Sequence, residues 1–129
     1  MTINQAIARV DALRENLMPA DIKVWWLLDV DRMIYEEIIK GREGEADVPY
    51  PNYTEDDGER ELIVPSPYEM LYVYRLEAEI LYTLNEIKKQ ANALMRYNEL
   101  LSGFAATLRW IRNFLLQCKT ILCKGRKRT

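Results

Sequence analysis

Apolar residues recur at helical spacing in four stretches of the chain, and each stretch predicts a helix. The first begins with Thr2 and Gln5, which are spaced as a capping box, and should end near Asn16. Its apolar face is formed by Ile3, Ala6, Ile7, Val10, Leu13 and Leu17.

The second helix should run from about Ala20 to Lys40, where Gly41 stops it. Trp25 and Trp26 diverge by about 100° around its axis, so one can fill the core while the other lies at the margin. We expect both to belong to the core, with an interface anchor as the alternative. The apolar stripe of this helix contains Ile22, Trp25, Trp26, Leu28 or Asp29, Met33, Ile34 and Ile38.

Pro65 and Pro67 define a corner in the middle of the chain, because neither can lie inside a helix. Ser66 can cap the third helix, with Pro67 in its first position and Glu69 in its third, close to a capping box. The apolar positions that follow are Tyr68, Leu71, Tyr72, Leu76, Ile80, Leu81 and Leu84.

The fourth helix follows a bend or a new cap at Asn85 and Glu86 and should run from about residue 86 to residue 116. Gly103 lies inside it, at a cost of about 1 kcal/mol relative to alanine. At roughly 45 Å, this helix exceeds the diameter of about 36 Å expected for a compact globule of this size. Its end should therefore overhang the domain, and its apolar residues call for a partner. Its seam steps by four and three residues, as in a coiled coil, through Ile87, Ala91, Leu94, Asn98, Leu101, Ala105, Leu108, Ile111 or Arg112, and Leu115.

Residues 41–61 break the helical periodicity and carry eight acids and two bases, a net charge of −6. A loop of about 20 residues in a compact domain is usually functional or mobile. VPYPNY within it predicts an extended piece with two exposed tyrosines, Tyr50 and Tyr53, and allows a short hairpin with Glu61–Val64. The sequence thus predicts an all-α bundle of about four helices in one domain, residues 1–118, with an extended segment at 41–64.

Residues 119–129 carry five Lys or Arg and no acid, so the rest of the chain has a net charge of −7. We expect this segment to be a flexible basic tail. It could contact nucleic acid or an acidic partner, or simply aid solubility.

The sequence shows no pattern of an enzyme, cofactor or metal site. Histidine is absent, and phosphate loops, nucleophile elbows and metal-binding Cys/His clusters are not found. Asp29 and Asp31 are interpreted as residues of a solvated helix face, as are Glu36 and Glu37. Cys118 and Cys123 match neither redox nor zinc spacing, so idle thiols in a cytosolic protein are expected. No stretch predicts a transmembrane helix or a signal peptide.

Three segments resemble small phage head–tail connector proteins, also called adaptors, which lie beneath the portal ring of tailed phages. VPSPYEMLYVYRLEAEI, at residues 64–80, is similar to a segment typical of that family. TINQAIARVDALREN and WWLLDVDRMIYEEII resemble its first two helices, the latter through the pattern Trp26, Leu27, Val30, Asp31, Ile34 and Tyr35. The likeness extends to about Phe114, whereas the two cysteines and the basic end depart from the family pattern.

This resemblance implies a non-enzymatic virion protein of the neck, made in the host cytoplasm. It implies a ring, usually of twelve subunits, that extends the DNA channel and binds the portal and a stopper or tail-completion protein. DNA would pass without sequence-specific binding, and no membrane or cofactor is involved.

We place the candidate sites as follows. Candidates for the portal contact are Trp110, Phe114, Leu115, Ile121, Leu122, Lys124, Arg126, Lys127 and Arg128. Candidates that line the channel or contact the next ring are Glu43, Glu45, Asp47, Tyr50, Tyr53, Asp56, Asp57 and Glu59. Candidates for the subunit interface are Trp25, Trp26 and Tyr74.

Two alternatives remain open. A helical interaction or regulatory module would form a small closed oligomer, a dimer along the seam at residues 87–115. A nucleic-acid-binding regulator would need a basic helix face, for which Lys88, Lys89 and Arg96 are sparse.

Overall fold

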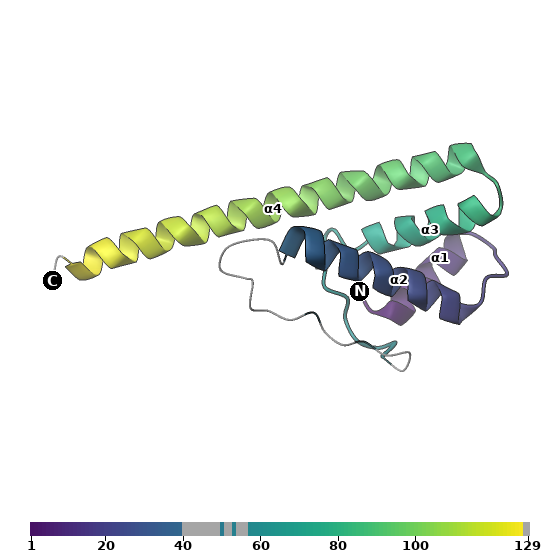
Figure 1. Ribbon diagram of the computed structural model, residues 1–129, viewed down its shortest axis with the longest axis horizontal. Helices are drawn as coiled ribbons and strands as arrows, with labels where there is room; N and C mark the ends of the chain where they lie inside the picture. The colour runs from purple at the N-terminus through teal and green to yellow at the C-terminus, as the bar shows by residue number, and fades with distance from the viewer. Residues whose placement is uncertain (40–49, 51–52, 54–56, 128–129) are drawn as a thin grey trace.

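The described part of the chain folds into four α-helices, whose arrangement is shown in Figure 1. This computed structural model describes the backbone of residues 1–39, 50, 53 and 57–127, and the side chains of these residues except 39, 112 and 114–127. The predicted all-α bundle with a long last helix is confirmed. Most of the predicted acidic segment, including Gly41, lies outside the described residues. The helices are α1 (Ile3–Leu13), α2 (Ala20–Ile34), α3 (Leu71–Thr83) and α4 (Ile87–Lys127), and a π-helix (Tyr35–Ile39) continues α2.

Helix α1 begins as predicted and ends earlier than predicted. Thr2 and Gln5 form a capping box. The helix ends at Leu13 rather than near Asn16, because Arg14 adopts an extended backbone. The side-chain amide of Asn16 donates from Nδ2 to the Arg14 carbonyl at 2.8 Å, and its Oδ1 accepts from the Met18 backbone amide at 3.2 Å. Asn16 therefore stabilises a turn instead of another helical residue.

Helix α2 buries a different stripe from the predicted one. Leu27, Val30, Asp31 and Ile34 lie in the core. Trp25 is 72% exposed, so the expectation of a core position was wrong for it. It lies about 200° around the helix from Leu27, which forces it to the opposite face. Trp26 packs partly against the core, as expected.

The corner before α3 differs from its prediction. The helix begins at Leu71, and its N-cap residue is Met70 instead of the predicted Ser66. Residues 65–70 form successive turns, and the Ser66–Pro67 peptide bond is cis. Glu69 does not complete a capping box, because its carboxylate accepts a hydrogen bond from the Met1 amine at 2.9 Å. The same amine donates to Glu61 at 2.6 Å.

The predicted hairpin has no counterpart in the described residues. Glu61 instead forms an antiparallel bridge with Thr2. The Leu62 amide donates to the Met1 carbonyl at 2.9 Å, so the N-terminus occupies the edge that the hairpin arm would need. Tyr50 and Tyr53 are half-buried rather than exposed. The Tyr53 hydroxyl donates to the Glu61 carbonyl at 2.7 Å.

A tight turn reverses the chain between α3 and α4, at the predicted bend. Asn85 has φ of 58°, in the left-handed region. Its amide donates to the Tyr82 carbonyl at 3.1 Å, and the Glu86 amide donates to the Leu81 carbonyl at 3.0 Å. This is a Schellman motif with asparagine in the left-handed position. It sets α4 antiparallel against α3, as Figure 1 shows.

Helix α4 packs on α3 through a face that the seam only partly predicts. Its buried residues are Ala93, Tyr97 and Phe104. Of the predicted seam, Leu94, Leu101, Ala105 and Leu108 are partly buried, whereas Ile87, Ala91 and Asn98 are exposed. The buried face of α4 is therefore centred on Ala93, Tyr97 and Phe104, and the predicted seam lies at its edge.

Gly103 lies within α4, as predicted, at a point of close approach. A Cβ atom at this position would lie 2.9 Å from Cε1 of Tyr68. The Tyr68 hydroxyl shares a hydrogen bond with the Thr107 hydroxyl at 2.7 Å, and its ring lies 6.0 Å from that of Phe104. Residues 63–70, the segment before α3, are called the corner segment. Glycine at position 103 lets Tyr68 of this segment pack closely on α4.

Helix α4 is longer than predicted. It has 41 residues and continues to Lys127, past the expected end near residue 116. It therefore includes most of the segment expected to be a flexible tail, residues 119–129. Most of residues 117–127 are good helix formers, and Gly125 alone opposes the helix by about 1 kcal/mol. The helix is about 60 Å long.

Candidate functional site

The C-terminal part of α4 extends beyond the bundle, as Figure 1 shows. Among the described side chains, Phe104 is the last buried one of this helix. Trp110 is 66% exposed and Ile111 is 40% exposed, and Arg109 is exposed beside them. Residues 109–127 continue as helix for about 28 Å. Helices of this length depend largely on tertiary packing for stability, which makes the overhang a candidate contact surface.

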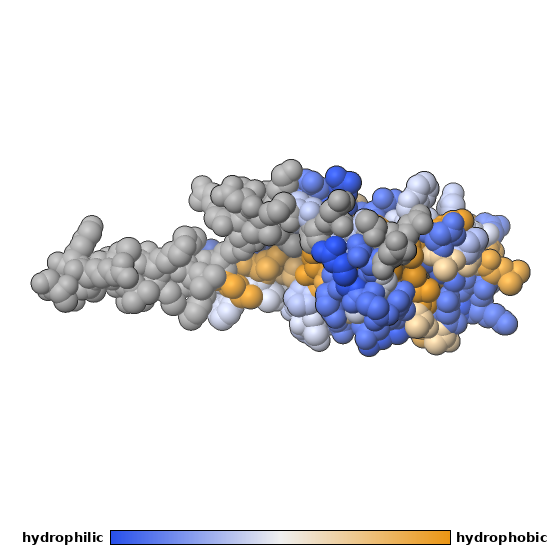
Figure 2. All heavy atoms as spheres, turned by 90° about the horizontal axis from the view of Figure 1, so that it is seen from below, coloured by the Kyte–Doolittle hydropathy of each residue, from blue (hydrophilic) through white to orange (hydrophobic). Residues whose placement is uncertain are grey.

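A second apolar surface lies at the opposite end of the molecule. It is formed where α1 ends, α3 ends and α4 begins, and Figure 2 shows hydrophobic surface there. A groove of about 430 Å³ opens between the α1–α2 connection and the end of α3. Leu17 and Leu84 line it, and Glu15 adds a carboxylate. We call this region the bundle-end surface; its exposed apolar residues are Leu13, Leu17, Tyr82, Leu84 and Ile87.

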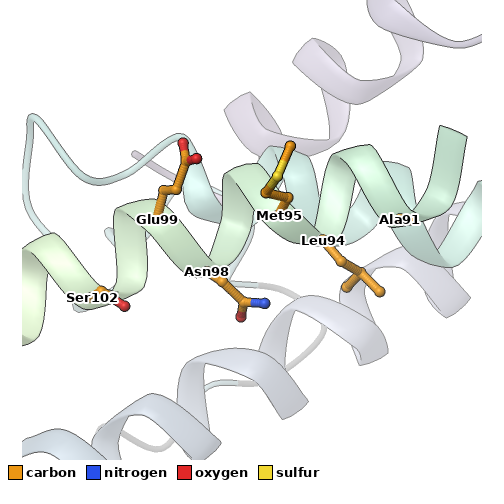
Figure 3. A pocket seen from close by; sticks show the side chains of 6 residues that line it. All are labelled: Ala91, Leu94, Met95, Asn98, Glu99 and Ser102. Carbon is orange, nitrogen blue, oxygen red and sulfur yellow. The ribbon is translucent and has the colours of Figure 1, made fainter.

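A third surface follows the outer side of α4 (Figure 3). It is a shallow, open depression on one helix, and Figure 3 shows that its side chains diverge to two sides. Met95, 55% exposed, is its largest exposed apolar group. The lining residues are Ala91, Leu94, Met95, Asn98, Glu99 and Ser102. Three of these residues, Ala91, Leu94 and Asn98, belong to the predicted seam.

Asp31 is a buried carboxylate with no exposed surface. The Tyr72 hydroxyl and the Ile63 amide donate to its Oδ1, the latter at 3.2 Å. The Tyr50 hydroxyl donates to its Oδ2 at 2.8 Å. Tyr72 in turn accepts from the Val64 amide at 3.0 Å. Asp31 therefore fastens α2 to α3 and to the corner segment.

Burial governs the pKa values in this cluster. It raises the pKa of Asp31, against the opposing effect of the hydrogen bonds from Tyr72, Tyr50 and Ile63. It also raises the pKa values of Tyr50 and Tyr72, and the Asp31 charge adds to both shifts. The two phenols remain protonated donors, which suits a structural network rather than acid–base chemistry.

The interpretation of Asp31 as part of a solvated face was wrong. Its position four residues after Leu27 and three before Ile34 lies on the buried stripe. That spacing was a usable signal, and so was its place in the pattern that carries the resemblance. The bundle-end surface was also missed, because Leu17 was assigned to the face of α1, which ends at Leu13.

The subunit-interface candidates differ in exposure. Trp25 is exposed, whereas Trp26 and Tyr74 pack partly against the core. The Arg96 guanidinium lies 5.7 Å from the centre of the Tyr74 ring. Only Trp25 of the three presents most of its surface to solvent.

The loop candidates that the structure describes contact the chain itself. Tyr50 binds Asp31, and its ring lies 5.5 Å from that of Tyr53. Asp57 pairs with Arg60 at 3.4 Å, and the Glu59 carboxylate accepts from the side-chain amide of Asn4 at 2.7 Å. The other loop candidates lie outside the described residues: Glu43, Glu45, Asp47 and Asp56.

Of the portal candidates, only Trp110 has a described side chain. The backbone of the others is helical as far as Lys127, and Arg128 lies outside the described residues. Their side chains lie outside the description, as do those of the two cysteines.

The boundary between α3 and α4 also separates charge. Residues 1–86 carry eight of the 18 basic and 19 of the 20 acidic residues, a net charge of −11. Residues 87–129 carry the other ten basic residues and one acid, a net charge of +9. The three-helix body is thus acidic, and the long helix that leaves it is basic.

Among the described residues, no group of three or more Cys, Asp or Glu side chains is placed to hold a metal ion. None of the described helices combines the length and hydropathy of a membrane span. Comparison with protein-family models, with curated proteins and with solved structures found no match.

Proposed function

We propose that this protein is a structural, non-catalytic subunit of a phage head–tail connector. It assembles as a ring, of twelve copies in our proposal, beneath the portal in the virion neck after synthesis in the host cytoplasm. The ring extends the DNA channel and docks the stopper or tail. The observation that carries this proposal is the overhang of α4, where Trp110 and Ile111 are exposed on a helix that leaves its own bundle.

The packing of the segments that carry the resemblance supports the proposal. The α2 pattern and the corner segment lie far apart in sequence and meet at Asp31, Val64 and Tyr72. Residues that determine the likeness therefore form one packing unit. This coherence is what a shared fold requires of residues distant in sequence.

We place the portal contact at the C-terminal end of α4, in the segment that contains Lys124, Arg126 and Lys127. Deleting residues 117–129 should weaken docking to the portal and leave the bundle folded, because the last described buried residue is Phe104. Circular dichroism and thermal unfolding of the truncated chain provide the control. Unchanged portal docking would rule out this placement.

The acidic segment is proposed to line the channel, where negative charge repels DNA phosphates and lets the duplex slide. It could instead contact the next ring. Replacing Asp56, Asp57 and Glu59 by their amides separates these roles. Normal tail joining with altered DNA retention supports the channel role, whereas defective tail joining supports the contact role.

Electron microscopy of the protein with the portal protein of the same genome tests the function. The expected result is a ring of added density at one end of the portal, absent from the portal alone. An absence of this density, with no change in portal particles at high protein concentration, would contradict a connector role.

A helical interaction module that dimerises through residues 87–115 is the second candidate. Exposed apolar residues within that range favour it, among them Ile87, 70% exposed, and Met95, 55% exposed. A stable dimer that Met95→Glu dissociates, with no binding to the portal, would support this candidate over the connector.

A further inference from the structure

We infer that copies of this protein join head to tail, with Trp110 and Ile111 of one copy seated in the bundle-end groove of the next. The inference deepens the proposed function and rests on it in one respect, namely that the protein acts as an assembly of copies. It names the two surfaces that would join neighbouring subunits.

The first argument is the position of the two surfaces. Trp110 and Ile111 lie on the overhang, and Leu17 and Leu84 line a groove at the other end of the long axis (Figure 1). Within one straight chain they cannot meet. Two different apolar surfaces on opposite ends of one molecule can cover each other only between copies.

The second argument is size. The groove has a volume of about 430 Å³, within the range of roughly 300–1,000 Å³ that is typical of sites enclosing a small ligand. An indole ring with a neighbouring aliphatic side chain is an occupant of that scale. Leu17 is fully exposed and Leu84 is 55% exposed, so contact would remove apolar surface on both sides.

The third argument is charge. Arg109 precedes Trp110 and is exposed, and Glu15 lines the groove. At a larger scale, residues 1–108 carry a net charge of −9 and the overhang at residues 109–129 carries +7, so the overhang of one copy attracts the body of the next. Such complementarity steers association and fixes orientation. Two overhangs carry charge of the same sign, as do two bodies, and this repulsion disfavours tail-to-tail and body-to-body pairs.

A contact between two different surfaces is heterologous, so it repeats until the assembly closes as a ring or grows as a filament. Only the first turns of the overhang are used. The end of α4, from about residue 117, remains available for the portal contact.

The test uses two full-length variants that each lack one surface. Trp110→Glu with Ile111→Glu removes the inserting pair, and Leu17→Lys with Leu84→Lys blocks the groove with charges that repel Arg109. All four positions are at least 40% exposed, so folding should persist, which circular dichroism checks. Met95→Glu is the matched control, because Met95 is an exposed apolar residue of α4 outside both surfaces.

Sedimentation velocity should show wild type and Met95→Glu assembling beyond a dimer. Each double variant alone should self-associate at least about 30-fold more weakly, as expected for loss of a central aromatic anchor. Mixed together, the two variants should form a 1:1 complex that grows no further, because one intact copy of each surface remains. Assembly of the wild type should also weaken as salt rises.

Three results would overturn the inference. They are a wild-type chain that stays monomeric, a mixture of the two variants that forms no complex, and an assembly lost in Met95→Glu but kept in the double variants. None of these decides the connector function, which the portal could still organise. Conversely, a chain that forms the 1:1 complex but does not bind the portal keeps this contact and loses the connector role.

Discussion

The hydroxyl of Tyr72 donates a hydrogen bond to the Asp31 carboxylate, joining α3 to α2 across 41 residues of sequence. Both side chains are fully buried. The same carboxylate accepts from Tyr50 and from the Ile63 amide. Asp31 thus organises the corner segment as well as the two helices.

Replacing Asp31 by alanine should destabilise the fold by about 2–4 kcal/mol, because the Tyr72 hydroxyl and the Ile63 amide lose a buried acceptor. Asp31→Asn should cost about 1 kcal/mol, since its oxygen still accepts and Tyr50 can accept from its amide. Urea unfolding of both variants measures the difference. Equal losses would show that shape, not hydrogen bonding, dominates at this site.

The raised pKa of Asp31 predicts a pH dependence. Burial favours the protonated acid in the folded state, so the contribution of Asp31 is fully present below its unfolded pKa of about 3.8 and is lost as pH rises through the folded value. The stability of the wild type relative to Asp31→Asn should therefore fall as pH increases from about 4. Urea titrations between pH 4 and 8 check this. A difference that stays constant or grows with pH would contradict it.

Gly103→Ala places two effects in opposition. Helix propensity favours alanine by about 1 kcal/mol, but the new methyl would lie 2.9 Å from an atom of the Tyr68 ring. The ring is held by Thr107 and Phe104, so we expect a net loss of about 1–2 kcal/mol. Thermal unfolding measures it. Gly103→Ala combined with Tyr68→Ala should be no less stable than Tyr68→Ala alone, and a further loss would rule out the ring contact as the cause.

Glu69→Gln should lower stability by about 1 kcal/mol, through loss of a charge-assisted hydrogen bond to the Met1 amine. Burial alone lowers the pKa of this amine, but hydrogen bonds from it to Glu61 and Glu69 outweigh that effect and the pKa is raised. The contribution is therefore present below the unfolded pKa of 8.0 and lost as pH rises through the folded value. The stability gap between wild type and Glu69→Gln should narrow above about pH 8. Glu79→Gln, which removes an i,i+4 ion pair with Arg75 at 3.4 Å, is the control.

Asn85 gives a test of the turn that directs α4. Asn85→Gly should be neutral or slightly stabilising, because glycine adopts the left-handed conformation at no steric cost. Asn85→Ala should cost about 1 kcal/mol, since φ of 58° disfavours a Cβ atom. Chemical unfolding of the pair separates backbone strain from loss of side-chain contacts, which both variants share.

Local patterns predicted the features that depend on neighbouring residues. The Thr2 capping box, the bend at Asn85 and the position of Gly103 all follow from spacing within a few residues. The start of α3 could not be predicted in this way, because Glu69 binds the Met1 amine, 68 residues away in sequence. A capping pattern predicts hydrogen bonds within its own segment, and it contains no information on partners that are distant in sequence.

The buried face of α4 and the partner of Asp31 also depend on residues that are distant in sequence. Helix α4 has apolar residues on two faces, and the position of α3 decides that Tyr97 and Phe104 are buried rather than Ala91. The spacing of Asp31 places it on the buried stripe of α2, but it does not identify the partner of the carboxylate. For Asp31 that partner, Tyr72, lies on another helix. Both outcomes depend on tertiary packing, which helical periodicity does not contain.

Because α4 is long, a small change in its direction where it packs on the bundle, around Gly103 and Phe104, displaces its far end by much more. From Phe104 to Lys127 the helix is about 35 Å long, so a tilt of about 10° at Phe104 moves Lys127 by about 6 Å, roughly one helical turn. Substitutions around Gly103 and Phe104 should therefore misdirect whatever the far end contacts, without altering a single residue of that contact.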